Sequence, residues 1–443
     1  MIRIRASRNK IAWRETAPSI LIVFNSFVWY ILTYAVFSSI VNELNLLDTE
    51  KLGLFVVYYI SIAVSAILGS KFFPRARNKS LYLWLFMGAI ATFLLIAFSN
   101  NGVLSDALLS FFFGASIGIG LPSCLSYFAD STSVENRGIL GGIIWSTVGF
   151  TLLIFAFLIN MLGQWEAIIA LTMWRLLGGV GFMLLNRKPT KFAAQKSPAY
   201  LELIRKKEIL LYLFPWVMFS IINFIEAPIL EGVFGTDFFA FVQLVESVFV
   251  GFVAIVGGFI ADIAGRKRVV IAGFVMLGVE YAALSAFSNS QAALYLFLIL
   301  DGITWGLLVS VFFTVIWGDL GEHYGKEKYY TLGGLPYLLG NFLYILIKPY
   351  AGGISATAAF TVASFFLFLA LIPLMYAPET LPEKVIKDRD LQSYVEKAKQ
   401  KAQKEAEKNQ KKHSDKAEKE KGKEEPEETP DDAEARKLAE KYY

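Results

Sequence analysis

Long apolar runs, separated by short breaks rich in charged or turn residues, fill most of the chain up to residue 376. A helix needs about 20 apolar residues to cross roughly 30 Å of hydrocarbon, and the runs have about this length. Twelve of them begin near residues 18, 52, 80, 105, 138, 166, 209, 239, 269, 292, 329 and 355. The pattern predicts an all-α polytopic membrane protein with twelve transmembrane helices.

Basic residues fall almost entirely in every second break. Cytoplasmic loops retain Lys and Arg, so these breaks are predicted to be cytoplasmic. They carry Lys71, Arg75, Arg77 and Lys79, then Arg137, then a cluster from Arg187 to Lys207, then Arg266, Lys267 and Arg268, then Lys326 and Lys328. A basic segment with Arg3, Arg5, Arg8, Lys10 and Arg14 also precedes the first run. Both chain termini are therefore expected in the cytoplasm.

The longest internal break, residues 187–208, divides the runs six and six. We therefore predict a cytoplasmic N-terminus (1–17), a six-helix bundle (18–186), a cytoplasmic linker (187–208), a second, pseudo-symmetric six-helix bundle (209–376) and a charged cytoplasmic tail (377–443). Residues 380–443 hold 17 basic and 17 acidic residues and few apolar ones. Such a tail is expected to be disordered or loosely helical, and the alternative is a helix that binds a partner.

Composition narrows the classes of protein. The chain is 55% hydrophobic and 18% charged, against about 25% charged in a soluble protein. A single cysteine, Cys124, excludes an internal disulfide, and both histidines lie outside the apolar runs, so no metal site is expected in the membrane. No phosphate-binding loop or nucleophile–base pair stands out. We expect no enzyme, no cofactor and no nucleic-acid partner.

Two of the basic breaks repeat at one fixed offset. The string from Gly258 to Arg268 aligns with the string from Gly69 to Lys79 when 189 is added to the residue number. The same offset carries Asp130 and Arg137 onto Asp319 and Lys326, so that an acid is again followed by a base seven residues later. Two loops that repeat with one spacing indicate parallel structural repeats, with a substrate site between them near the membrane midplane.

These residues resemble motifs of the major facilitator superfamily. The residues Gly258, Asp262, Gly265, Arg266 and Lys267 are similar to its G-x-x-x-D-x-x-G-R-K signature, although the first copy has Phe73 in place of the acid. Tyr127-x-x-Asp130 followed by Arg137-Gly138, and Pro378-Glu379-Thr380 after the last run, resemble motifs of the sugar-porter branch. The resemblance implies a transporter of two six-helix bundles.

The charged motifs are candidates for a conformational latch, made of Gly258, Asp262, Gly265, Arg266, Lys267, Asp130, Arg137, Asp319 and Lys326. Asp262 ends a helix and is expected to accept hydrogen bonds from a neighbouring helix N-terminus while pairing with Arg266. The resemblance implies the same role, with Asp130 paired to Arg137 and Asp319 to Lys326. Formed on a closed cytoplasmic side, these contacts would favour the outward-facing state. The alternative is that they only anchor helix ends at the lipid headgroups.

Four acids lie inside apolar runs of the second half: Glu226, Glu246, Glu280 and Asp301. An ionised carboxylate at a helix centre costs about 2.5–3.5 kcal/mol on the insertion scale. From the rise of about 1.5 Å per residue, Glu246, Glu280 and Asp301 are expected at one level of the bundle. They are candidates for carrying protons or binding solute, and the alternative is protonated, hydrogen-bonded packing. The polar residues Asn25, Tyr34 and Asn223 are further candidates for binding, with core packing as their alternative.

The function predicted first is a secondary active transporter, a symporter of a small organic solute that works by alternating access and is coupled to protons. One alternative is an exporter of cationic or amphipathic compounds. Another is a non-transporting membrane sensor or scaffold that uses its charged tail. The expected partners are the lipid bilayer, a small organic solute and protons, for a monomer that spans the cell membrane many times.

Overall fold

The protein is described by a computed structural model covering residues 11–98, 102–186, 197–288, 290–383, 385–387, 391, 394–395, 397–408 and 429–442. The predicted basic segment Arg3–Lys10, the first part of the predicted linker (187–196) and the middle of the tail (409–428) lie outside these residues. The described residues from Ile11 to Ile386 form one compact unit, and the tail from Lys387 belongs to a second, which is described by itself.

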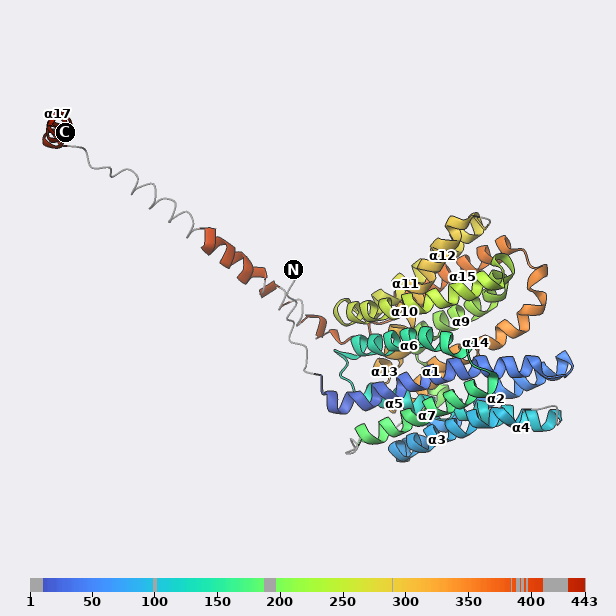
Figure 1. The fold of residues 1–443 in the computed structure, drawn as a ribbon. Coiled ribbons are helices and arrows are strands. Elements are labelled where there is room, and N and C mark those ends of the chain that lie inside the picture. Colours follow the sequence, from blue (N-terminus) through green and yellow to red (C-terminus); the bar gives the residue numbers. More distant parts are fainter. Residues whose placement is uncertain are drawn as a thin grey trace. The chain divides into compact units, whose positions relative to one another are not determined.

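The described chain is helical and contains no β-strand (Figure 1). Its first half holds α1 (Trp13–Glu43), α2 (Asp48–Phe72), α3 (Arg77–Phe93), α4 (Val103–Gly118), α5 (Leu121–Asp130), α6 (Arg137–Asn160) and α7 (Gln164–Leu185). Its second half holds α8 (Tyr200–Arg205), α9 (Lys207–Phe234), α10 (Thr236–Ala264), α11 (Arg266–Ala286), α12 (Gln291–Leu307), α13 (Trp317–Leu320), α14 (Glu327–Ile347) and α15 (Ala356–Tyr376). A π-helical segment, Leu308–Ile316, joins α12 to α13.

Each of the twelve predicted starts falls within five residues of a helix start. Eleven helical stretches of the described chain are long and apolar enough to cross a membrane. One of them, Asp48–Ala97, has 50 residues, and at about 1.5 Å per residue it is too long for one crossing. It consists of α2 and α3, joined by the 3₁₀ turn Phe73–Ala76, and a final 3₁₀ turn, Leu94–Ala97. Helix α2 packs on α4, whereas α3 packs on α7.

Two glycines make the tightest connections between long helices. A single residue, Gly235, separates α9 from α10, and a single residue, Gly265, separates α10 from α11. Both have positive φ angles, 83° and 104°. A side chain is strained in this region of backbone space, so glycine allows each sharp reversal.

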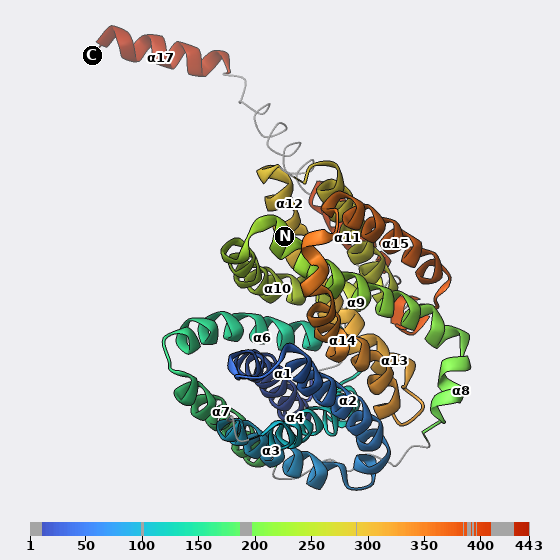
Figure 2. The ribbon, with the colours of Figure 1, turned by 90° about the vertical axis from the view of Figure 1, so that its right-hand side faces the viewer.

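The helices form an N-terminal set (α1–α7) and a C-terminal set (α9–α15), which lie side by side in Figure 2. The sets meet mainly where α6 packs along α10 and where α14 packs on α2. Small residues allow the α6–α10 contact: Cβ atoms added at Gly142 and Gly258 would lie 2.4 Å from the Ala254 carbonyl oxygen and 2.2 Å from the Gly138 carbonyl oxygen. Such close approach of helix backbones is typical of membrane helix packing.

The described tail residues are helical at 397–408 and in α17 (Pro430–Tyr442). The side chains at 397–408 and 430–441 are exposed and mostly charged. The expectation of a disordered or loosely helical tail is not tested for residues 409–428, which lie outside the described part.

Candidate functional site

A cavity of about 1420 Å³ lies between the two helix sets. Its walls come from α1, α2 and α6 on one side and from α9, α10, α11, α12 and α14 on the other. The exposed residues Asn42, Asp48 and Tyr350 belong to its lining, so it opens at the end of the helices that carries the connections α1–α2 and α14–α15. We call this the cavity end.

Aromatic side chains from both sets meet at the inner end of the cavity. The Trp145 indole N–H donates to Thr314 Oγ1 at 2.7 Å, and the Phe313 ring lies 5.4 Å from that of Phe27 and 5.2 Å from that of Tyr337. Trp145 and Tyr337 also line the cavity. Rings in contact across the two sets form a floor that separates the cavity from the opposite end of the helices.

Three carboxyl groups gather at one place in the C-terminal set. Glu246 of α10 and Asp301 of α12 both line the cavity, and their side chains interact electrostatically. Glu280 of α11 is fully buried next to them and interacts electrostatically with both Asp301 and Glu246. No donor among the described residues satisfies either Glu280 oxygen. No Lys or Arg among the described residues pairs with these three carboxyls, and neighbouring carboxylates repel one another when they are ionised together.

Tyr281 is a neighbour of these groups that sequence reasoning missed. It lies on α11 next to Glu280, lines the cavity, and interacts electrostatically with Asp301, Glu226, Glu280 and Glu246. A helix places consecutive residues about 100° apart. Glu280 and Tyr281 can therefore face the same cluster from different sides, which a sequence pattern does not reveal.

The remaining candidates divide between the cavity wall and the core. Asn223 and Tyr34 line the cavity, and the Tyr59 hydroxyl donates to the Tyr34 hydroxyl at 2.8 Å. Glu226 is buried outside the lining, one helical turn from Asn223. Asn25 is buried in the N-terminal set, where its amide donates to the Trp174 carbonyl and its oxygen accepts from Arg175 at 3.1 Å.

The opposite end of the helices carries the charged residues of the predicted latch. We call it the charged end, and we call Arg77, Asp130, Arg137, Asp262, Arg266, Asp319, Glu322, Lys326 and Glu327 the charged network. The described lining of the cavity includes none of these residues.

Asp262 joins the two sets through the start of α6. Its two carboxylate oxygens accept from the backbone N–H groups of Gly138 and Ile139, both at 2.9 Å, and Arg266 lies 3.0 Å from it. The first N–H groups of a helix lack partners within the helix and carry a partial positive charge, so a carboxylate is favourable there. Gly138 makes room for the acid, because an added Cβ would lie 2.4 Å from Asp262 Oδ1.

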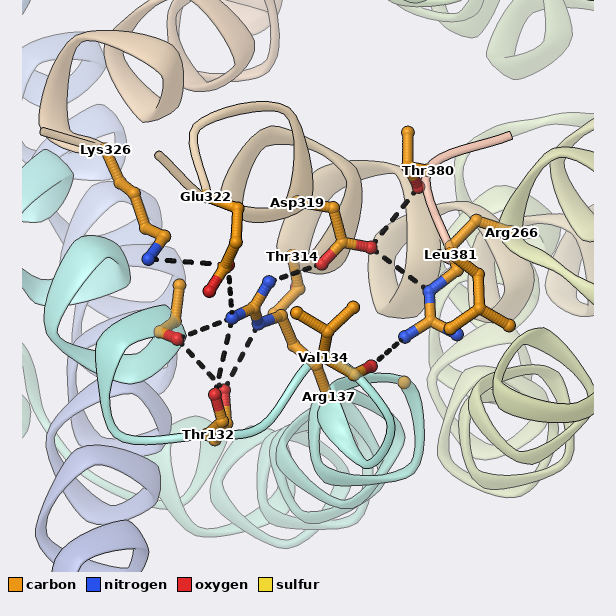
Figure 3. Close-up of polar contacts among 12 residues, drawn as sticks. Thr132, Val134, Arg137, Arg266, Thr314, Asp319, Glu322, Lys326, Thr380 and Leu381 are labelled. Carbon is orange, nitrogen blue, oxygen red and sulfur yellow. Dashed lines mark hydrogen bonds and ion pairs between the residues drawn. The ribbon is translucent and has the colours of Figure 1, made fainter. Parts of the chain in front are cut away.

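Asp319 lies between two arginines from different sets (Figure 3). One of its oxygens accepts from Arg137 of α6 and the other from Arg266 of α11 at 3.2 Å. Arg266 also donates to the Val134 carbonyl, and Arg137 to the Ala129 carbonyl at 2.7 Å. Both arginines are fully buried. A buried cation needs such a complete set of acceptors, so this junction holds only when the two sets are together.

The second acid of the repeat, Asp130, also pairs across the sets. Its oxygens lie 2.6 Å from Arg77 and 2.6 Å from Lys326. The predicted pairs Asp130–Arg137 and Asp319–Lys326 are wrong: each acid pairs with the base of the other loop. The acid of each loop pairs with the base of the loop in the other repeat, across the approximate twofold relation between the repeats. The spacing of seven residues within a loop fits pairing within that loop equally well, so it could not predict the partners.

Arg77 and Glu327 were not among the predicted latch residues, although the offset of 189 relates both to residues of the loop motifs. It carries Arg77 onto Arg266 and Gly138 onto Glu327. In the C-terminal repeat the acid stands on α10, as Asp262, and faces glycine on α6. In the N-terminal repeat the corresponding residue is Phe73, and the acid is Glu327 on the facing helix α14, paired with Arg77. The acid has thus changed sides of the contact.

The remaining motif residues support this junction. Glu379 accepts from the backbone N–H groups of Arg266 and Lys267 at 2.8 and 3.2 Å, and the Thr380 hydroxyl donates to Asp319 at 3.2 Å. Gly265 leaves room for that glutamate, since an added Cβ would lie 2.4 Å from Glu379 Oε2. The segment after α15 therefore holds the turn from α10 to α11.

Comparison with known proteins agrees with this architecture. A human organic anion transporter, MFSD10 (TETRAN), has a similar fold, with a TM-score of 0.60 and 12% sequence identity over 82% of this chain and 99% of that one. A search of curated proteins finds no match to the sequence. The sugar-porter resemblance of the loops stays a prediction. The family model of the Major Facilitator Superfamily matches residues 19–316, and the chain therefore belongs to this family of membrane transporters.

Proposed function

We propose that the chain is a secondary active transporter that moves a small organic solute by alternating access. The observation that carries this proposal is that the two ends of the helix sets differ. A cavity opens between the sets at one end, and a buried charged network joins them at the other. A site between two repeats that opens to one side at a time is the arrangement used by such transporters.

We further propose that the structure corresponds to the outward-open state. Lys71, Arg75, Lys79, Lys267 and Arg268 all lie at the charged end, and positively charged loops are retained in the cytoplasm. Counting α2 and α3 separately gives twelve spans, and an even number of spans supports the proposal that both termini lie on that side. The two bundles are then residues 18–186 and 209–376, joined by the linker and followed by the tail.

In this proposal the charged network is the latch. Its ion pairs and the Asp262 cap form only when the cytoplasmic ends of the sets meet, so they lower the free energy of the outward-open state relative to the inward-open one. Removing one member of a buried pair leaves a charge without its partner, which costs about 3–5 kcal/mol. A shift of this size is enough to invert the populations of two states.

The carboxyl cluster supports coupling to protons. Glu246, Asp301 and Glu280 lie beside the cavity without a basic partner among its described inner residues. Ionising them in the outward-open state and protonating them again after closure would carry protons across with each cycle. Whether solute and protons move in the same or in opposite directions depends on whether the solute binds to these same carboxyl groups.

Spin labels at the cavity mouth test the proposed cycle. In a Cys124→Ala background, Thr49→Cys and Tyr350→Cys place labels on opposite walls. Adding Asp262→Asn and Arg137→Gln removes latch contacts, so electron–electron distance measurements in nanodiscs should show a shorter distance population as the mouth closes. Arg75→Gln, an exposed base at the same end, is the matched control and should leave the distances unchanged. Identical distributions in all three proteins would refute alternating access governed by this latch.

A further inference from the structure

The charges that line the cavity are distributed unevenly with depth. At the mouth, Lys348 pairs with Glu231 at 3.2 Å, and the Lys51 ammonium donates to the Asn42 carbonyl at 2.6 Å. Deeper, the lining contains Glu246 and Asp301 and, among its described residues, no Lys or Arg. The inner part of the cavity is therefore an acidic site whose charge is not balanced by protein.

A buried arginine in the middle of α7 does not change this balance. Arg175 is fully buried and does not belong to the described cavity lining. Its guanidinium lies 4.1 Å from the Trp29 ring centroid and 4.4 Å from that of Trp84, and it donates to Ser26 at 2.7 Å. Aromatic faces and neutral oxygens stabilise it inside the helix set, so it is not available to an anion in the cavity.

The walls around the acidic site are aromatic. Tyr337 and Trp305 have ring centroids 6.1 Å apart, and both line the cavity together with Tyr30, Trp145 and Phe224. Tyr337 also lies within electrostatic range of Glu246. Ring faces attract cations, and a carboxylate beside them supplies the charge, so the combination favours a cation with apolar substituents over an anion.

From this geometry we propose that the cavity binds a monovalent organic cation against Glu246 and Asp301, and that the cation and a proton exchange at these carboxyls. The proposal rests on the proposed function and names its substrate class. When the cation arrives, a carboxyl O–H bond breaks, its proton leaves through the cavity to water, and the carboxylate pairs with the cation. The electron pair of the broken O–H bond stays on the carboxylate oxygen. The net charge of the site is unchanged, because the charge of the cation replaces that of the proton.

Competition for one site fixes the mode of coupling. A transporter whose carboxyls hold either a cation or a proton carries one in each direction, which is exchange rather than the symport expected from the sequence. Glu280 acts as a positioning residue: its buried carboxyl lies beside Asp301, interacts electrostatically with it, and is not part of the described cavity lining. It keeps a proton beside Asp301 at each stage of the exchange.

Two ions of nearly the same shape and opposite charge test the proposal. Tetraphenylphosphonium and tetraphenylborate are titrated into the full-length protein by calorimetry, in two buffers with different heats of ionisation. We expect only the phosphonium to bind in the cavity, with release of close to one proton and with weaker binding as the pH is lowered, because protons compete with the cation. Stronger binding of the borate, or no binding of either ion, would overturn the assignment of a cation site.

Variants connect the binding to the named residues. Glu246→Gln and Asp301→Asn should each weaken phosphonium binding by about tenfold or more, which is about 1.4 kcal/mol. Asp237→Asn, an exposed acid on the same helix as Glu246 and outside the lining, should bind normally. Melting temperatures establish that each variant is folded. Normal binding in both cavity variants would refute the site.

Glu280→Gln tests the positioning role separately. This variant should retain phosphonium binding but change the number of protons released and flatten the pH dependence, which a purely structural role would not do. Unchanged proton release would exclude Glu280 from the exchange. If neither ion binds while the spin-label distances still respond to the latch variants, the substrate class is wrong and alternating access stands.

Discussion

At the scale of single residues, the charged network shows how a repeat can keep a contact while changing the residues that make it. Asp262 on α10 faces Gly138 on α6. Phe73, directly after α2, corresponds to Asp262, and Glu327 on α14 corresponds to Gly138. One carboxylate stands in each contact, on opposite helices. The geometry therefore requires an acid at the junction but not on a particular side of it.

This equivalence predicts a rescue. Glu327→Gly removes one of the two acidic partners of Arg77 and should destabilise the protein by roughly 1–3 kcal/mol, because a largely buried arginine loses an acceptor. Adding Phe73→Asp should recover much of this loss, since the new acid lies four residues before Arg77 and can accept from the start of α14, as Asp262 does with Arg266 and α6. Thermal unfolding in detergent measures both effects. A double variant less stable than Glu327→Gly would contradict the equivalence.

Residue-level prediction from sequence succeeded where charge and repetition were informative. The offset of 189 identified Asp130, Arg137, Asp319 and Lys326 as related residues, but their partners were exchanged, because spacing along a loop carries no information on contacts across a twofold relation. Among the acids, Glu246 and Asp301 lie on the cavity wall and Glu226 and Glu280 lie outside it. The sequence could not separate them, because the helices are apolar on all sides and lipid-facing and buried residues look alike.

At the scale of elements, the seam between α6 and α10 depends on small residues. Gly142, Gly149 and Gly258 each approach the facing backbone so closely that an added Cβ would lie 2.2–2.5 Å from a carbonyl oxygen. The two helices can thus stay in contact over several turns while the cavity opens beside them. Helix positions followed from the apolar runs, whereas this seam depends on pairing of helices that are distant in sequence.

Substituting one seam glycine should separate these helices. Gly258→Ala places a methyl group 2.2 Å from the Gly138 carbonyl oxygen, and backbone cannot yield as a flexible side chain does. We expect a melting temperature lower by several degrees, in line with a loss of about 1–3 kcal/mol from overpacking. Gly334→Ala, in α14, is the control, because nothing lies within 4 Å of its added Cβ. Equal melting temperatures for Gly258→Ala and Gly334→Ala would show that α6 and α10 can move apart without loss of stability, against this prediction.

At the scale of the whole molecule, the transport unit and the tail are separate. The described residues up to Ile386 form one unit, and the tail from Lys387 belongs to another. Cavity, charged network and carboxyl cluster all lie within the first unit. If transport is the function, it requires nothing from the charged tail, whereas a sensor or scaffold would depend on it.

Deleting residues 391–443 distinguishes a transporter from a sensor or scaffold. We expect the truncated protein to retain exchange of radiolabelled tetraphenylphosphonium for protons in proteoliposomes, within about twofold of the full-length rate, because every residue assigned to the cycle remains. Protein orientation and amount in the vesicles are matched between the two preparations. Complete loss of exchange in a correctly folded truncated protein would make the tail part of the transport machinery.

The charged network is one continuous chain of contacts, and this has a kinetic consequence. Arg77 touches Asp130, which touches Lys326; Glu322 links Lys326 to Arg137, and Asp319 links Arg137 to Arg266 and so to Asp262. Because neighbouring pairs share an atom group, rupture of one exposes the next to water and weakens it. The junction should therefore come apart cooperatively, as an all-or-none event with a single barrier, rather than peel open pair by pair.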